Sequence, residues 1–191
     1  MDLNYNGQEK HSRENLTRKI TAGQYALMLI FLFTILNLVL LLLNTDRYFL
    51  FSASLPYYLT LVGMGLDNNF SSLGWDQIGT HTVTALVISA VILLLYFLCL
   101  VLSSKRPGWL VGALVLFLVD TAALAVFSFV LYENPAANLM DGFLHLWAII
   151  ELFQAVLANR KLKKLPPEVP VDLNQFRGTL RDMAEDSQHI E

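Results

Sequence analysis

Three ionisable side chains lie inside long apolar stretches of the sequence, where a charge is costly: Asp120, His145 and Glu151. On helices, Asp120 would lie about 16 Å from one end of its apolar stretch, and Glu151 about 18 Å from the opposite end of the next. If the two helices run antiparallel, both carboxyl groups reach about the same depth. Two carboxylates in a low dielectric are not both easily ionised. This pair, together with His145, is therefore expected to bind a proton and to couple it to transport.

Smaller polar side chains are expected around this pair. The last apolar stretch places Asp141, Ala148 and Glu151 on one face at a spacing of about 3.5 residues, which is typical of a helix packed against others. The supporting polar residues are Asp141, His81, Asn37 and Ser89. The alternative is structural: the acids accept hydrogen bonds from neighbouring side chains and only fix how the helices pack. Those neighbours would be Asn37, Ser89, Thr121 and Gln154.

A metal centre is a third kind of site that these residues allow. His81, Asp141 and His145 combine the imidazole and carboxylate ligands that zinc uses. However, the sequence has one cysteine, no H-E-x-x-H pair, no phosphate-binding glycine motif and no G-x-S-x-G motif. We therefore assign no metal, no cofactor and no catalytic residue.

These side chains need elements that hold them within an apolar layer. Hydrophobic residues make up 55% of the 191 residues and charged residues 15%, whereas soluble domains average about 45–50% and about 25%. Mean hydropathy is +0.51. The apolar residues gather in stretches of roughly the 20 residues that a membrane-spanning helix needs. The predicted spans are 20–43, 80–102, 109–132 and 139–158.

The predicted fold is an all-α integral membrane four-helix bundle. Segment 48–66 is apolar and aromatic but contains Pro56 and two glycines, so we expect an outer interfacial or re-entrant segment. Residues 1–19 form a cytoplasmic N-terminal lead, 20–158 the transmembrane domain and 159–191 a cytoplasmic tail. A short amphipathic tail helix is predicted from the spacing of Leu173, Phe176, Leu180 and Met183.

The distribution of Lys and Arg decides the number of spans. With four spans and a cytoplasmic N-terminus, every cation except Arg47 falls on the cytoplasmic side, as the positive-inside rule requires. With 48–66 as a fifth span, most cations would lie outside. We therefore expect a plasma-membrane protein with both termini in the cytoplasm and no nucleic-acid partner. The cations expected to contact anionic lipid headgroups are Arg160, Lys161, Lys163 and Lys164.

The segment FLFSASLPYYLTLVG, residues 49–63, carries a resemblance to a known group of proteins. It resembles small uncharacterised multipass membrane proteins of Gram-positive bacteria, over about the first two-thirds of the chain. The resemblance implies a bacterial plasma membrane and no particular activity.

Three classes of function remain open. The first is a small ion or solute transporter or channel that uses the buried acids, and acts as an oligomer because four helices enclose little space. The second is a non-enzymatic accessory or scaffold subunit of a larger membrane complex. The third, an intramembrane metal-assisted enzyme, is favoured less because no catalytic motif is present. A transporter requires Asp120 and Glu151 to face each other across a water-filled cavity.

Overall fold

The computed structural model describes residues 3–43, 45, 48–67, 79–131 and 139–166. Within these ranges the chain forms five α-helices, one short 3₁₀ turn and no strand. The helices are α1 (Leu3–Leu42), α2 (Ser54–Leu66), α3 (Thr80–Lys105), α4 (Leu110–Leu131) and α5 (Leu139–Leu162), and the turn η2 (Pro107–Trp109) joins α3 to α4. The predicted tail helix at 173–183 lies outside the described residues.

Four of these helices are long and apolar enough to cross a membrane. Their candidate spans are His11–Leu42, Thr80–Lys105, Pro107–Ser128 and Leu139–Leu162. Helices α3, α4 and α5 match the predicted spans to within about one helical turn. Helix α1 differs because it begins at Leu3 and includes most of the polar lead 1–19. The four apolar helices fit a multipass membrane protein.

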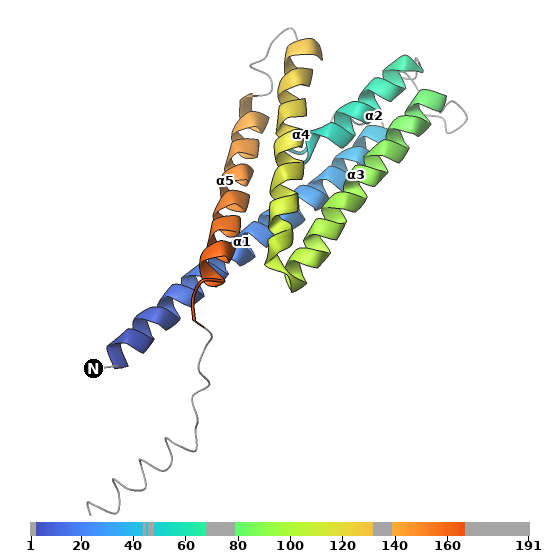
Figure 1. Ribbon diagram of the computed structural model, residues 1–191. Coiled ribbons are helices and arrows are strands. Elements are labelled where there is room, and N and C mark those ends of the chain that lie inside the picture. Colours follow the sequence, from blue (N-terminus) through green and yellow to red (C-terminus); the bar gives the residue numbers. More distant parts are fainter. Residues whose placement is uncertain (1–2, 44, 46–47, 68–78, 132–138, 167–191) are drawn as a thin grey trace, which may run out of the picture.

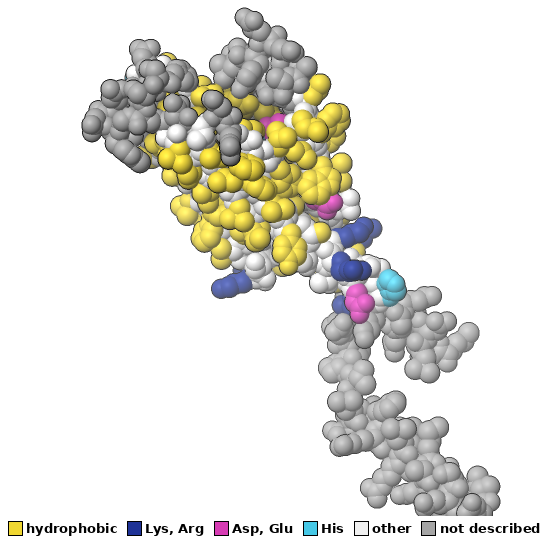
Figure 2. Space-filling view, turned by 180° about the vertical axis from the view of Figure 1, so that it is seen from behind, with side chains coloured by type: hydrophobic (Ala, Val, Ile, Leu, Met, Phe, Trp, Pro, Cys, Tyr) yellow, Lys and Arg dark blue, Asp and Glu magenta, His cyan; other side chains and the backbone are white. Residues whose placement is uncertain are grey.

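The surface of the bundle is apolar across its middle. Figure 2 shows hydrophobic side chains covering the central part of the visible face, with Lys and Arg gathered toward one end. Val87, Val115 and Phe153 are each more than half exposed. An exposed apolar surface of this extent is costly in water and is accommodated by lipid. The surface therefore suggests a membrane-embedded protein.

The helices pack closely where glycine or alanine removes side-chain bulk. Helix α1 lies against α5, and α2 lies beside α3 (Figure 1). Gly23 of α1 faces Ala155 of α5, and a Cβ at Gly63 of α2 would lie 2.8 Å from both the Ala85 Cβ and the His81 carbonyl oxygen of α3. Small residues at such contacts let two helix backbones approach each other.

Segment 48–66 enters the bundle and leaves it again. The first residues of α2 contact Asp120, which lies near the middle of α4, whereas Asp67 at the other end of α2 contacts the start of α3. Before α2 the chain turns sharply at Phe51, whose φ of 70° lies in the left-handed region. The Phe51 ring packs against Trp147, with ring centroids 5.0 Å apart. This turn lets an extended stretch reach the bundle interior before the helix begins.

We expect Gly63→Ala to destabilise the protein by about 1–3 kcal/mol, because its new methyl group overlaps the backbone of α3. Gly142→Ala is the control, since a Cβ there meets no atom within 4 Å. Thermal unfolding in detergent micelles measures both variants. Equal unfolding temperatures for the two variants would contradict the close contact between α2 and α3.

Candidate functional site

The buried carboxylate of Asp120 binds the first turn of α2. Its Oδ2 accepts a hydrogen bond from the Ser54 N–H at 2.9 Å, and its Oδ1 accepts one from the Leu55 N–H at 2.8 Å. Asp120 is 1% exposed. The first N–H groups of a helix have no partner within the helix, and a negative charge at this end is favourable. Asp120 therefore caps α2 from a different helix.

The other residues at the start of α2 either donate their N–H group to an acceptor or have no N–H group. The N-cap residue Ala53 has no side chain that could cap, and its own N–H donates to Thr34 Oγ1 of α1 at 2.8 Å. The next donor would come from Pro56, which has no N–H. The first four residues of this helix end, 53–56, therefore have either a bonded N–H group or no N–H group. This matters because a buried N–H group without an acceptor costs about 1–3 kcal/mol.

Helix α1 holds the extended stretch that precedes α2. The Asn37 amide nitrogen donates to the Phe49 carbonyl at 2.7 Å and to Ser52 Oγ at 2.8 Å, while its oxygen accepts the Phe49 N–H at 2.8 Å. Asn37 is 1% exposed. Its role is therefore to pair backbone groups of a stretch that lacks regular structure, as buried polar backbone requires.

His145 of α5 lies between two acids. Its Nε2 is 3.2 Å from Asp120 Oδ2, and its Nδ1 is 2.9 Å from the Asp141 carbonyl oxygen and 3.5 Å from Asp141 Oδ1. The ring stacks on Phe117, with centroids 4.9 Å apart and planes 11° apart. Because a carbonyl oxygen only accepts, Nδ1 carries a hydrogen. A hydrogen bond between Nε2 and Asp120 then requires a second hydrogen, on either the imidazole or the carboxyl group.

Two hydroxyl groups complete the polar cluster. Asp141 Oδ2 accepts hydrogen bonds from Tyr48 Oη at 3.2 Å and from Ser54 Oγ at 3.4 Å. Burial raises the pKa of Tyr48 well above its usual range, and the nearby Asp141 charge raises it further, so Tyr48 remains a donor. Among the described residues, Asp141 Oδ1 is buried without a hydrogen bond. We call Tyr48, Ser54, Asp120, Asp141 and His145 the central cluster.

Glu151 is not part of the central cluster. Asp120 contacts His145, and Glu151 follows His145 by a further six residues, or about 9 Å along α5. Glu151 is half-buried, and its carboxylate makes no hydrogen bond or ion pair with any other residue that the structure describes. The expected pairing of Asp120 with Glu151 is therefore wrong, because the end of α4 and the start of α5 are not level: Asp120 lies 11 residues before the end of α4, whereas its partner His145 lies six residues after the start of α5.

The two remaining candidate residues, Ser89 and His81, occupy separate places. Ser89 binds the Pro56 carbonyl at 3.0 Å and lies 3.2 Å from Thr60 Oγ1, joining α3 to α2. His81 lies at the far end of α2, 2.8 Å from Asp67 Oδ1. It therefore does not join Asp141 and His145 in one ligand set, and no group of three metal-ligating side chains occurs within the described residues.

Asp67 repeats at α3 what Asp120 does at α2. Its Oδ2 accepts the Thr82 N–H and the Thr82 hydroxyl, each at 2.7 Å, at the start of α3. Any side chain at Gly79 would collide with this carboxylate. Hydrogen bonds from the Thr82 backbone, the Thr82 side chain and His81 lower the pKa of Asp67 to about 2. This acid was not among the predicted site residues, although it directly follows the glycine-rich end of the aromatic segment.

Ser54, His145 and Asp141 have the order of a nucleophile, a base and an orienting acid. Ser54 Oγ lies 3.3 Å from His145 Nε2. However, Nε2 lies equally close to Asp120, and Ser54 and His145 are both fully buried. A nucleophile must reach its substrate and the neighbouring N–H groups must be free to bind an oxyanion. Here Asp120 occupies those N–H groups, so they are not available to an oxyanion.

We expect Asp120→Asn to destabilise the protein by about 1–3 kcal/mol, because an amide offers one acceptor oxygen to two N–H donors. Hydrogen exchange at Ser54 and Leu55 should also become faster. Thr121→Val is the control on the same helix, since the Thr121 hydroxyl binds the carbonyl of Phe117 at 2.8 Å. Unchanged exchange at Ser54 and Leu55 in Asp120→Asn would rule out the cap.

Asp67 gives a prediction for acid stability. Its pKa is depressed in the folded protein, from an ordinary value of 3.8 to about 2. Its stabilising contribution is therefore complete above about pH 4 and is lost as the pH falls toward about 2. The difference in unfolding temperature between wild type and Asp67→Asn should shrink across that range. His81→Gln keeps the Thr82 hydrogen bonds and should retain most of the wild-type acid dependence. A pH profile of Asp67→Asn parallel to that of wild type would contradict the assignment.

No family model matches this chain, and no curated protein or solved structure matches it. The function proposed below therefore rests on the residues of the chain itself.

Proposed function

We propose that the protein is a non-enzymatic accessory or scaffold subunit of a membrane complex. The observation that carries the proposal is the double hydrogen bond from the first turn of α2 to Asp120. The residue that would have to bind a cargo or a proton is thereby committed to holding a helix in place. Such a protein acts through the surfaces that its fold presents.

The setting that we propose is a bacterial plasma membrane with both chain termini in the cytoplasm. The positive-inside rule supports this orientation, since Lys105 and Arg106 at the α3–α4 turn would lie on the same side as the cations after α5. Segment 48–66 would then re-enter the bundle from the outer side. The basic residues Arg160, Lys161, Lys163 and Lys164 would contact anionic headgroups on the cytoplasmic side.

The partner in such a complex is a second copy or another membrane subunit. Glu151 supports a protein partner, because a half-buried carboxylate on an apolar helix without a bond to any described residue is costly in lipid. A polar group from a neighbouring helix would lower that cost.

A second candidate is a small proton-coupled transporter. It is favoured by His145, whose ring nitrogens lie 3.2 Å from Asp120 Oδ2 and 3.5 Å from Asp141 Oδ1 in the interior of the bundle. In this alternative the buried Asp141 Oδ1 without a hydrogen bond would receive the proton, and Tyr48 would be the group nearest the connection between α1 and α2.

Reconstitution separates the two candidates. Purified protein in liposomes that contain a pH-sensitive dye should give no proton influx above that of empty liposomes, under an imposed pH gradient and membrane potential. The variants are His145→Gln, which removes the imidazole, and Glu151→Gln as the matched control outside the central cluster. A saturable influx that His145→Gln abolishes and Glu151→Gln preserves would replace the accessory role with the transporter.

Copurification from native membranes tests directly for the partner that an accessory role requires. Wild-type protein extracted in nanodiscs should retain one membrane protein in a fixed ratio, and deletion of 173–183 should reduce that ratio severalfold. A chain recovered only as a monomer, without any membrane partner in a fixed ratio, would contradict the accessory role.

A further inference from the structure

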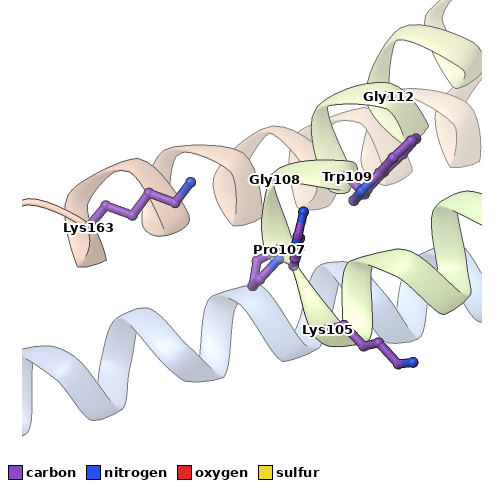
Figure 3. Close-up of a pocket in the computed structure, with 7 residues that line it drawn as sticks. Lys105, Pro107, Gly108, Trp109, Gly112 and Lys163 are labelled. Atoms are coloured by element: carbon purple, nitrogen blue, oxygen red, sulfur yellow. The ribbon is translucent and has the colours of Figure 1, made fainter.

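A pocket opens far from the central cluster, where the α3–α4 turn meets the end of α5. Its volume is about 600 Å³. Figure 3 shows Lys163 extending from the end of α5 toward the turn, with Pro107 and Gly108 beside it and Lys105 leaving the end of α3 on the other side. Cationic side chains from two separate helix ends therefore flank one hollow.

The lining of this pocket has a positive charge. Lys105, Arg106 and Lys163 contribute three cations, and none of the residues that line the pocket is an acid. An arginine fork and lysine ammonium groups are the side chains that bind phosphate oxygens. Trp109, which is 44% exposed, adds an indole N–H donor and an apolar ring. The chemistry fits a phosphate group attached to an apolar molecule.

The surface below the pocket continues as an apolar stripe along α4. Gly108 and Gly112 line the pocket, and Val115 and Val119 follow them on the same helical face at spacings of three and four residues. Val115 is 55% exposed and Val119 is 56% exposed. A free phosphate ion would leave this stripe uncovered, whereas a lipid chain would lie along it.

The two glycines make the pocket possible. A Cβ at Gly108 would meet no atom within 4 Å, and a Cβ at Gly112 would meet Cys99 Sγ only at an ordinary 3.5 Å. A side chain at Gly108 would therefore project into open space without disturbing the fold. The position offers a way to fill the pocket while its cations stay in place.

We infer that this pocket binds the phosphate headgroup of an anionic phospholipid, with one acyl chain lying along Val115 and Val119. The inference rests on the four apolar helices lying in a membrane and not on the accessory role. It differs from general attraction of the basic tail to lipid, because the cations come from the α3–α4 turn as well as from α5 and line one hollow.

The test compares lipid binding by variants with the same net charge. The pocket variant is Lys105→Gln with Lys163→Gln, and its control is Arg18→Gln with Lys19→Gln, two exposed cations of α1 that do not line the pocket. Native mass spectrometry of protein in detergent measures retention of added phosphatidylglycerol against phosphatidylcholine. We expect about tenfold weaker retention of phosphatidylglycerol in the pocket variant and near wild-type retention in the control. Gly108→Leu should lower retention similarly with all cations present.

Three outcomes would overturn the inference. Equal loss in the pocket and control variants would show diffuse attraction to basic residues. Full displacement of the lipid by millimolar glycerol 3-phosphate would show a site for a soluble phosphate. Wild-type retention in a folded Gly108→Leu variant would show that the lipid binds elsewhere. Size-exclusion chromatography establishes that each variant is folded, and none of these outcomes depends on whether the protein has a partner subunit.

Discussion

The fold depends on how a helix that begins inside an apolar bundle finds acceptors for its first N–H groups. Water supplies them at a protein surface, but the first turn of α2 is buried. Asp120 of α4 and Thr34 of α1 supply them instead, and Pro56 removes the last donor. Because both acceptors come from other helices, α1, α2 and α4 must be assembled together before the first N–H groups of α2 are all satisfied.

The central cluster extends from this cap. Asp120 also contacts His145, and His145 is fixed in turn by Asp141 and by the Phe117 ring. If Asp120 contacted only α2, the rest of this buried carboxylate would have no polar neighbour. The His145 imidazole of α5 supplies that neighbour. The same residues therefore explain both the packing of four helices and the burial of two acids beside one imidazole. Asp67 caps α3 in the same manner at the exposed end, without a buried counterpart.

The sequence predicts the helices of this protein much better than their contacts. Apolar stretches of spanning length identify α3, α4 and α5 closely, and charge within them identifies Asp120 and His145 as unusual. The partners of Asp120 were not predictable, because they are backbone N–H groups. Almost every residue has one, so a sequence pattern cannot mark them. The pairing of Asp120 with Glu151 failed because depth was counted from helix ends that were taken to be level, whereas α4 extends beyond the start of α5 (Figure 1). Ala53, which cannot cap its own helix, is the one local sign that an acceptor must come from elsewhere.

The capping of α2 by α4 also constrains the order in which the helices assemble. The Ser54 and Leu55 donors leave the ribosome well before Asp120, because α3 and the turn η2 lie between them in the chain. Until α4 is inserted, those donors can be satisfied only by water or lipid headgroups at the bilayer surface. Segment 48–66 therefore cannot complete its hydrogen bonds inside the bundle until α4 is in place.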